Sequence, residues 1–564
     1  MASHSTILDA QGRKIPAQAI ERIRTRARTG MRGSLDGPNR SLFPYDAASI
    51  GGQEYGDWYP ITRSPDSEIN IYRDRIVGRG RDLYRNDGWA KGIVGRILDS
   101  TIGSSYRLVA KPDWRALSYH SKAFDAVWAD EFRRAAEAHW RNYAEDLGHY
   151  NDVGRKQTVS QQWRVALGHK LIDGESLIVA QWRPDRVGAS AARYATCFQG
   201  VDPDRLSNPY QQQDTRYLRG GVEIDRDEVP IAYHIRKAHQ YDWYNATESM
   251  EWDRVLREDP EDGWQRVYHD YDLDRFAQNR GMSIFAPVLG RLKMLAKYYG
   301  VELSAATVAS HFGLYVTSPF DLEMVRAALE GEVEADDPAQ SGFGWYQDMR
   351  SDFHRDRTMP ISGVNMATLA PGEEIKTVSA ERPNANFSPF THEMLRGVGQ
   401  CVGLSGEQTH NDWSDTSWSS ARAGVAESEK MFIRREQDFQ TNTATPIYAT
   451  WLAEPFDLGE LPLPRNAPAY MEMRTAYSRC RWLGTPRGFV DPVSERQGVV
   501  LGLDAGLSTL EEECARQGVD WEENLAQRAI EFNRMTELGL PRPQWFGEDK
   551  SATEAAQPPQ KEQA

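Results

Sequence analysis

The sequence predicts an α+β multidomain protein in which long helices alternate with regions of mixed helix and strand. The chain has 564 residues, 40% of them apolar, which suits roughly two to four domains with real cores. Residues 283–312 and 391–446 carry the spacing of long helices, and short β-type runs lie before and between them. We therefore expect several folded regions joined along one chain.

The charge balance argues against a protein that grips nucleic acid. Acidic residues number 82 against 67 basic ones, which gives a net charge of -15. Phosphate contacts come from Lys and Arg, so any contact with DNA should be local or repulsive. The 17 tryptophans are spread along the chain, which favours packing and interfaces over one binding platform.

Cysteine spacing and hydropathy exclude two further classes. The cysteines show no C-x-x-C pairing, which predicts small core residues in place of disulfides or a zinc cluster. They are Cys197, Cys401, Cys480 and Cys514. No apolar run approaches 18 residues, and the N-terminal MASHSTILDAQGRK lacks the apolar region of a signal peptide. We therefore expect a protein made in the cytoplasm, with no membrane partner.

Residues 1–70 are rich in Arg, Gly, Ser and Pro, with a basic patch between Arg13 and Arg32. This composition favours a basic, partly disordered N-terminal arm. An arm that docks on a neighbouring molecule or on nucleic acid is the alternative.

Residues 71–280 mix helical and strand patterns and are expected to form one α/β domain with a helical base. Apolar residues at helical spacing predict helices over 71–102, with a break at Asn86–Gly88, and over 121–143 and 161–173. Strands are expected over 106–110, 176–182, 222–225 and 231–236, the last two as a β-hairpin.

Residues 281–312 predict the first long helix, which opens near Ser283 with Pro287 in its first turn. Its apolar stripe is Val288, Leu292, Leu295, Tyr299, Leu303 and Ala306. Three basic residues cluster near its start: Arg291, Lys293 and Lys297. They are either an ordinary solvated helix face or a patch that faces phosphates.

Residues 313–385 read as a small α/β insertion between the two long helices. A strand is expected at Leu314–Thr317, followed by an acidic run over 321–337 whose one basic residue is Arg326. Short strands are then expected over 358–378, around the turn Pro371–Gly372.

Residues 386–485 predict a second pair of helices around an acidic loop. The first helix spans Thr391–Val402, with Met394, Val398, Cys401 and Val402 on its apolar face, and ends at Gly403. The loop at 408–418 contains Asp412, Trp413, Asp415 and Trp418 but no Lys or Arg, and we expect an exposed turn. A long helix should then run from an N-cap at Ser419 or Ser420 to Pro446.

The C-terminal part divides in two. Residues 486–545 return to helical spacing, whereas 546–564 are rich in Ala, Gln, Glu and Pro. We expect a helical region followed by a disordered tail.

The chain carries no common catalytic motif: no phosphate-binding G-x-x-x-x-G-K-[ST], no G-x-S-x-G and no H-E-x-x-H. The segment HDYDLD, which holds His269, Asp270, Asp272 and Asp274, could bind a divalent metal through its oxygens, but a plain polar loop is favoured. No catalytic residue, metal or cofactor is assigned. The many tryptophans and carboxylates keep open a hydrolase that acts on polysaccharide through a Trp/carboxylate cleft.

Several stretches in sequence order resemble one family. They are RDLYRNDGWAKGIVGRILDSTIGSSYRL, LIDGESLIV, VDPDRLSNP, GGVEIDRDEVPIAYHI, RGMSIFAPVLGRLKMLAKYYGVELSAATVAS, LAPGEEIKTVSAERPNANFSPF and SSARAGVAESEKMF. Together they are similar to the lambda-type portal proteins of tailed bacteriophages, over roughly residues 71–540.

The resemblance implies a portal fold and a dodecameric ring at one capsid vertex, through which double-stranded DNA is packaged and later ejected. It implies no enzymatic activity. Its parts would be a wing at 71–280, stem helices at 281–312 and 386–407, a clip at 313–385, a tunnel loop at 408–418, a long helix returning to the wing at 419–485, and a crown at 486–545.

The resemblance also implies partners. The clip would dock the large subunit of terminase and afterwards head-completion or tail connector proteins, while major capsid or scaffold proteins surround the ring. Its acids would present like charge on every subunit, so we expect a basic surface on the docking partner. They are Asp321, Glu323, Glu330, Glu332 and Glu334.

Acids at the tunnel loop would suit DNA that must slide, since each phosphate neutralised by Lys or Arg adds affinity. Arg291, Lys293 and Lys297 are candidates for a weak positive ring in the stem. A third alternative is a virion or cell-surface interaction protein without a channel. The size of the particle in solution separates these possibilities.

Overall fold

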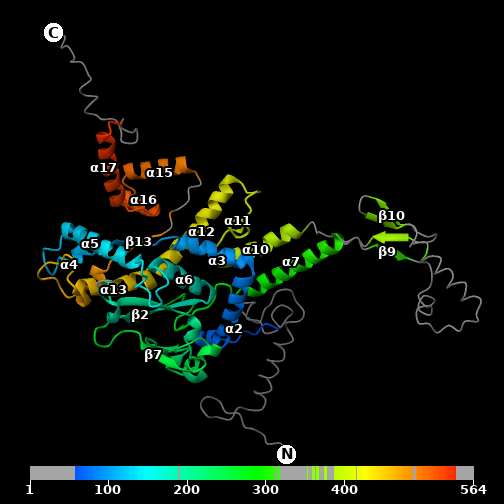
Figure 1. The fold of residues 1–564 in the computed structure, drawn as a ribbon, viewed down its shortest axis with the longest axis horizontal. Helices are drawn as coiled ribbons and strands as arrows, with labels where there is room; N and C mark the ends of the chain where they lie inside the picture. Colours follow the sequence, from blue (N-terminus) through cyan, green and yellow to red (C-terminus); the bar gives the residue numbers. More distant parts are fainter. Residues whose placement is uncertain are drawn as a thin grey trace, which may run out of the picture. The chain divides into compact units, whose positions relative to one another are not determined.

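The computed structural model describes residues 57–188, 191–310, 386–414, 416–484, 486 and 491–540, together with 314–317, 352, 358–361, 364–367 and 374–377. Two compact units are separated, Met1–Ser67 and Glu68–Ala564. Nearly all described residues belong to the second unit, and Figure 1 gives the order of its elements. Most of the N-terminal arm and the tail 546–564 lie outside the described residues.

Buried aromatic side chains from distant parts of the chain form the centre of one core. Trp163 of α6 (Val159–Ile172) and Trp451 of α13 (Thr445–Asp457) are fully buried. The ring of Trp163 lies 5.0 Å from that of Trp482 in β13 (Cys480–Leu483), and Trp140 of α5 (Ala126–Ala144) lies 5.0 Å from Trp451. The packing role predicted for the tryptophans is confirmed for these residues.

Helix boundaries in the predicted α/β region follow capping chemistry. α2 (Pro65–Asn86) and α3 (Gly88–Thr101) meet at Asp87, whose carboxylate accepts the backbone N–H of Ala90, so the predicted break is confirmed. α5 begins later than predicted because Asp125 is its N-cap. The turn after α6 requires Gly174, whose φ is +91°.

Two antiparallel sheets complete this region. β2 (Glu175–Trp182) lies between β3 (Thr196–Val201) and β8 (Val267–Tyr271). The second sheet has the order β4-β5-β6-β7, with bounds Leu218–Arg219, Val222–Ile224, Pro230–Arg236 and Trp252–Leu256. The predicted hairpin is confirmed as β5 and β6. β1 (Arg107–Ala110) pairs with β13.

The shorter helical elements lie between these strands and helices. They are α4 (Trp114–Leu117), η2 (Pro184–Arg186), η3 (Pro203–Arg205), η4 (Pro209–Gln211), η5 (Trp243–Asn245), η6 (Glu248–Met250), η8 (Tyr470–Met473) and α14 (Arg474–Tyr477).

The first long helix, α7 (Leu289–Ser310), packs antiparallel to α10 (Phe387–Val402), and Figure 1 shows the two side by side. Tyr298 stacks on Phe387 with ring centroids 5.5 Å apart, while Cys401 Sγ at the other end of α10 lies 3.8 Å from the Ile284 carbonyl. α7 begins later than predicted, because the chain around Pro287 forms turns.

Two predicted apolar faces are partly wrong. Leu303 of α7 is 71% exposed, since α10 begins opposite Tyr298 and the described residues place no helix alongside the last turns of α7. On α10 the buried face is Leu395, Val398 and Val402, whereas Cys401 is exposed. Gly403, with φ of +82°, ends α10 as predicted.

The insertion between these helices contains β9 (Leu314–Thr317), β10 (Thr358–Ile361), β11 (Val364–Ala367) and β12 (Glu374–Thr377). β9 pairs with β12, and β10 pairs with β11, both antiparallel. The predicted strands are confirmed. The turn Pro371–Gly372 and the acidic run 321–337 lie outside the described residues.

The predicted end of the long helix at Pro446 is wrong. α12 (Trp418–Phe439) passes into a π-helical turn, η7 (Gln440–Ala444), and then into α13, which continues to Asp457. The π turn closes one helix, so Pro446 falls in the first turn of the next, where its missing N–H costs no helical bond.

The C-terminal helices are α15 (Pro492–Asp504), α16 (Leu510–Arg516) and α17 (Trp521–Glu537). They confirm the predicted helical region. Among the described residues, no helix is both long enough and apolar enough to span a membrane.

Candidate functional site

The basic residues of α7 lie on two faces of the helix. A methyl group placed on Gly397 of α10 would lie 3.1 Å from Arg291 Nη1, so the end of this side chain lies beside α10. Lys293 and Lys297 are one turn apart and exposed. Two positions along a helix turn the direction by about 200°, so Lys293 points away from Arg291. The cluster seen in the sequence is therefore divided.

The acidic loop is shorter than predicted. α11 (Gly406–His410) occupies its first part, because Ser405 and Gln408 form a capping box. Asn411 leaves that helix in the left-handed conformation, and Ser417 is the N-cap of α12, not Ser419 or Ser420. Trp418 thus belongs to the helix. The loop proper runs over 411–417, and Asp415 lies outside the described residues.

Asp412 is the charged group that the structure places in this loop. Its Oδ1 accepts the Ser414 hydroxyl at 2.6 Å and the Ser414 N–H at 3.1 Å. These hydrogen bonds hold the pKa of Asp412 below its usual value, so the carboxylate is ionised at neutral pH. Trp413 and Trp418 flank it with 38% and 58% of their surfaces exposed.

The base of the loop is anchored from two sides. The Asp412 N–H donates to His410 Nδ1 at 3.2 Å, and the His410 ring stacks on His392 of α10 with centroids 4.4 Å apart. Burial and the neighbouring His392 lower the pKa of His410, which favours the neutral ring that can accept this bond. From α3, Arg96 Nη2 donates to Asn411 Oδ1 at 3.2 Å.

The π turn behind α12 is held by a buried ion pair. Asp270 of β8 accepts Lys170 Nζ at 2.8 Å, and its oxygens also accept Asn442 Nδ2 at 3.1 Å and Thr443 Oγ1 at 3.2 Å. Asp272, the residue directly after β8, lies 3.0 Å from the same Lys170. Two of the acids considered as metal ligands in HDYDLD, Asp270 and Asp272, therefore hold an ammonium group, and the first half of the segment is strand.

A second buried network fixes the start of the chain that leads into α7. Glu175 is fully buried and accepts Arg73 Nη2 at 2.7 Å, Arg280 Nε at 2.9 Å and the Gly281 N–H at 3.0 Å. His269 Nε2 lies 3.1 Å from its second oxygen. Burial alone would raise the pKa of Glu175, but Arg280 and Arg73 hold it well below its ordinary range.

Sequence reasoning missed this network. Its one local signal is Glu175 at the start of a strand whose following residues are mostly apolar, where a charged side chain needs buried partners.

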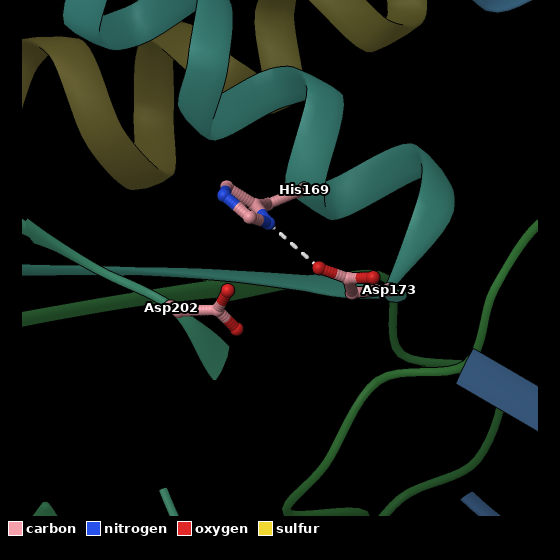
Figure 2. Close-up of side chains that lie close together, drawn as sticks. All are labelled: His169, Asp173 and Asp202. Atoms are coloured by element: carbon pink, nitrogen blue, oxygen red, sulfur yellow. Dashed lines mark hydrogen bonds and ion pairs between the residues drawn. The ribbon is translucent and has the colours of Figure 1, made fainter. Parts of the chain in front are cut away.

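A third acidic group has the spacing of metal ligands. Figure 2 shows His169 and Asp173, joined by a 2.6 Å contact, with Asp202 opposite. One ligand atom from each lies within 4.8 Å of the others. Arg81 of α2 already bridges the acids, with Nε 2.7 Å from Asp173 Oδ1 and Nη2 2.8 Å from Asp202 Oδ1. A guanidinium thus supplies the positive charge, and the group joins α2 to α6 and η3.

The polysaccharide-cleft hypothesis gains no support from the cleft beside α13 and α14. This cleft of 750 Å³ has carboxylates from Asp113 and Glu472 in its wall, but no tryptophan lines it. Trp140, Trp163 and Trp451 instead belong to the core.

Comparison with known proteins gives a consistent result. Residues 51–436 match the family described as "Phage portal protein, lambda family". The portal protein of Escherichia phage N15 is 30% identical over 521 residues, which cover 91% of this chain and 95% of that protein. Portal protein B of Escherichia phage lambda is 28% identical over 519 residues, covering 91% and 94%.

Solved structures add a weaker likeness. A chain from the neck of a native GTA particle, computed with C12 symmetry, is 13% identical and has a TM-score of 0.33, covering 73% of this chain and 95% of that one. A chain from the virion of a native gene transfer agent is 14% identical, with a TM-score of 0.35 and coverages of 76% and 99%.

These matches settle the class of protein. The matched family is structural and not catalytic, so the hydrolase alternative is not supported. The share of the chain matched by the family and the identity to the N15 protein lead to one conclusion. The chain belongs to the lambda family of phage portal proteins.

Proposed function

We propose that this portal protein forms a dodecameric ring whose central channel passes double-stranded DNA during packaging and ejection. In this proposal α7 and α10 are the stem, and residues 408–418 are the tunnel loop, of which 411–417 lie between α11 and α12. The observation that carries it is the antiparallel α7–α10 pair, which joins the core at one end and the insertion 313–385 at the other. The acidic loop follows directly after that pair.

The charge on the loop suits a conduit that does not hold its cargo. Asp412 is ionised, and Asp415 would add a second negative charge on each subunit. A phosphate neutralised by Lys or Arg adds affinity that a translocating polymer must then overcome, whereas a carboxylate adds none. Trp413 and Trp418 give the loop a broad, uncharged surface beside the acid.

The stem is the part that could attract DNA weakly. Lys293 and Lys297 share one exposed face of α7, while Arg291, also exposed, lies on another face beside Gly397 of α10. Repetition around a ring multiplies even a small charge per subunit.

The remaining parts follow the same proposal. Residues 71–280 are the wing and 486–545 the crown. The insertion is the clip that docks terminase and later the connector proteins. Its five acids, Asp321, Glu323, Glu330, Glu332 and Glu334, lie outside the described residues, so that assignment rests on their charge in the sequence. The ring would occupy a capsid vertex in contact with capsid or scaffold proteins.

Native mass spectrometry and imaging of one purified sample test the proposal. The expected result is a particle of twelve times 64.0 kDa with a central channel. A monomer under all conditions would contradict the ring. A ring whose reconstruction places Asp412 on the outer surface would retain the ring but reject the tunnel loop.

A further inference from the structure

The C-terminal helices have an unusual distribution of burial. Residues 491–540, here called the C-terminal module, comprise α15, α16 and α17, and no apolar side chain among them is buried. Its buried side chains are two acids, Glu513 and Asp520. Leu501 and Ile530 are 68% and 63% exposed. The module therefore has no apolar core of its own within one chain.

The contacts between the module and the rest of the chain are mostly ionic. Four basic residues of β1, α5 and β13 and the lysine that follows β1 form a basic patch. They are Arg107, Lys111, Arg133, Arg141 and Arg481. The module presents acids to this patch. Glu523 binds Arg107 Nη2 at 2.9 Å and also Arg141, and Glu522 binds Arg133.

The neighbouring helix uses the same chemistry. Glu511 of α16 binds Lys111 and lies 4.0 Å from Arg481 Nη1. A small packing contact adds to these pairs, since a methyl group on Gly518 would lie 3.0 Å from the Gly484 carbonyl oxygen. Ion pairs made by acidic side chains are thus the main contacts between the C-terminal module and the rest of the chain.

Such a contact responds to salt differently from an apolar one. Partly exposed ion pairs are screened as ionic strength rises, with a screening length of about 8 Å at 0.15 M and about 3 Å at 1 M. Apolar burial is not weakened in this way. At high salt the core around Trp163 and Trp451 should therefore stay protected from hydrogen exchange, while the C-terminal module loses its protection.

We propose that the C-terminal module docks reversibly on the basic patch, and that salt or removal of either set of charges releases it while the body stays folded. The partner of this surface is the chain's own acidic module. The inference goes beyond the proposed channel function and does not depend on it, because every contact used lies within one chain.

Hydrogen exchange on the full chain at 0.1 M and 1 M NaCl tests the proposal. Exchange in α16 and α17 is expected to rise by about tenfold at high salt, since several exposed pairs together shift an equilibrium by roughly a decade. Exchange in α6 and α13 should stay unchanged. Equal protection of the module at both salt concentrations would overturn the proposal, as would parallel loss in α6 and α13.

Charge variants at low salt separate docking from helix stability. Arg107→Gln combined with Arg141→Gln alters the body and leaves α17 intact, so faster exchange in α17 would report release alone. The matched control is Glu531→Gln with Glu537→Gln, whose carboxylates bind Gln527 and Arg534 within α17. If this control loosens α17 as much as the patch variant does, the ionic docking is refuted.

Discussion

Replacing Glu175 by Gln removes a buried negative charge without changing the volume of the side chain. Two guanidinium groups, Arg73 and Arg280, are 2% and 4% exposed and depend on this carboxylate for charge balance. Removing one partner of a buried ion pair costs about 3–5 kcal/mol, because the remaining charge is left without compensation. We expect Glu175→Gln to lower the free energy of unfolding by that amount.

The control is an exposed pair with the same chemistry. Arg254 Nε lies 2.7 Å from Glu223, but the two side chains are 46% and 29% exposed, and exposed pairs contribute about 0–1 kcal/mol. Glu223→Gln should therefore change stability little. Urea unfolding of both variants, followed by tryptophan fluorescence, measures the difference. If Glu175→Gln costs no more than Glu223→Gln, the reasoning about buried charge is refuted.

The dependence on pH has a definite sign. Arg280 and Arg73 hold the pKa of Glu175 below its unfolded value, against the effect of burial. The carboxylate therefore contributes stability that is complete above the unfolded pKa and is lost as pH falls through the folded pKa. The gap between the wild-type protein and Glu175→Gln should persist at neutral pH and narrow only in strong acid.

Two further predictions concern a raised pKa and a strained backbone. Burial and the acids Asp520 and Glu523 raise the pKa of Glu137 to about 7 despite Arg133, so ionisation of Glu137 opposes folding as pH rises from its unfolded pKa to about 7. Glu137→Gln should therefore be more stable than wild type by about 3 kcal/mol at pH 8 and equal to it near pH 4.5. A difference in denaturation midpoints that is constant across this pH range would contradict the prediction. Gly174→Ala should abolish soluble folding, because the new Cβ would lie 2.4 Å from the Met282 backbone and the residue has a φ of +91°. The control is Gly95→Ala in α3, where no atom lies within 4 Å of the new Cβ; this variant should keep the yield and melting temperature of the wild type.

Helices were predictable where one segment carries its own signals. Apolar spacing located the break between α2 and α3, although α2 begins at Pro65 and not at residue 71, and Gly403 located the end of α10. α11 was missed although the sequence contains its capping box, Ser405 and Gln408. A capping box is a local sequence motif, so the start of α11 could have been predicted from the sequence.

Long-range pairing could not be predicted in the same way. Glu175 meets Arg73 and Arg280, which come from segments far before and after it in the chain. The π turn at η7 likewise depends on Asp270, whose oxygens accept hydrogen bonds from the side chains of Asn442 and Thr443. Periodicity describes one segment at a time, so it cannot register contacts that exist only after distant segments meet.

The candidate site has a further reason to escape prediction. In the proposed ring the channel belongs to no single subunit, so the face of α7 that would line it is set by symmetry among copies. The spacing of Lys293 and Lys297 shows that they share a face, but only the arrangement of neighbours decides whether that face meets DNA. The sequence shows that the loop contains acids, but their distance from the symmetry axis of the proposed ring depends on how the subunits assemble.

The loop and the core are connected by one helical column. α12 begins at Trp418 beside the loop, and the first half of α13 lies inside the core, where Ile447, Tyr448 and Trp451 are fully buried. Between them η7 breaks the regular bonding, and its side chains are fixed to Asp270, which Lys170 neutralises. The loop and the core are therefore joined through a turn whose backbone is the least regular part of the column. Removing Lys170 would leave the Asp270 carboxylate that binds this turn buried without its charge partner, so the turn depends on that pair.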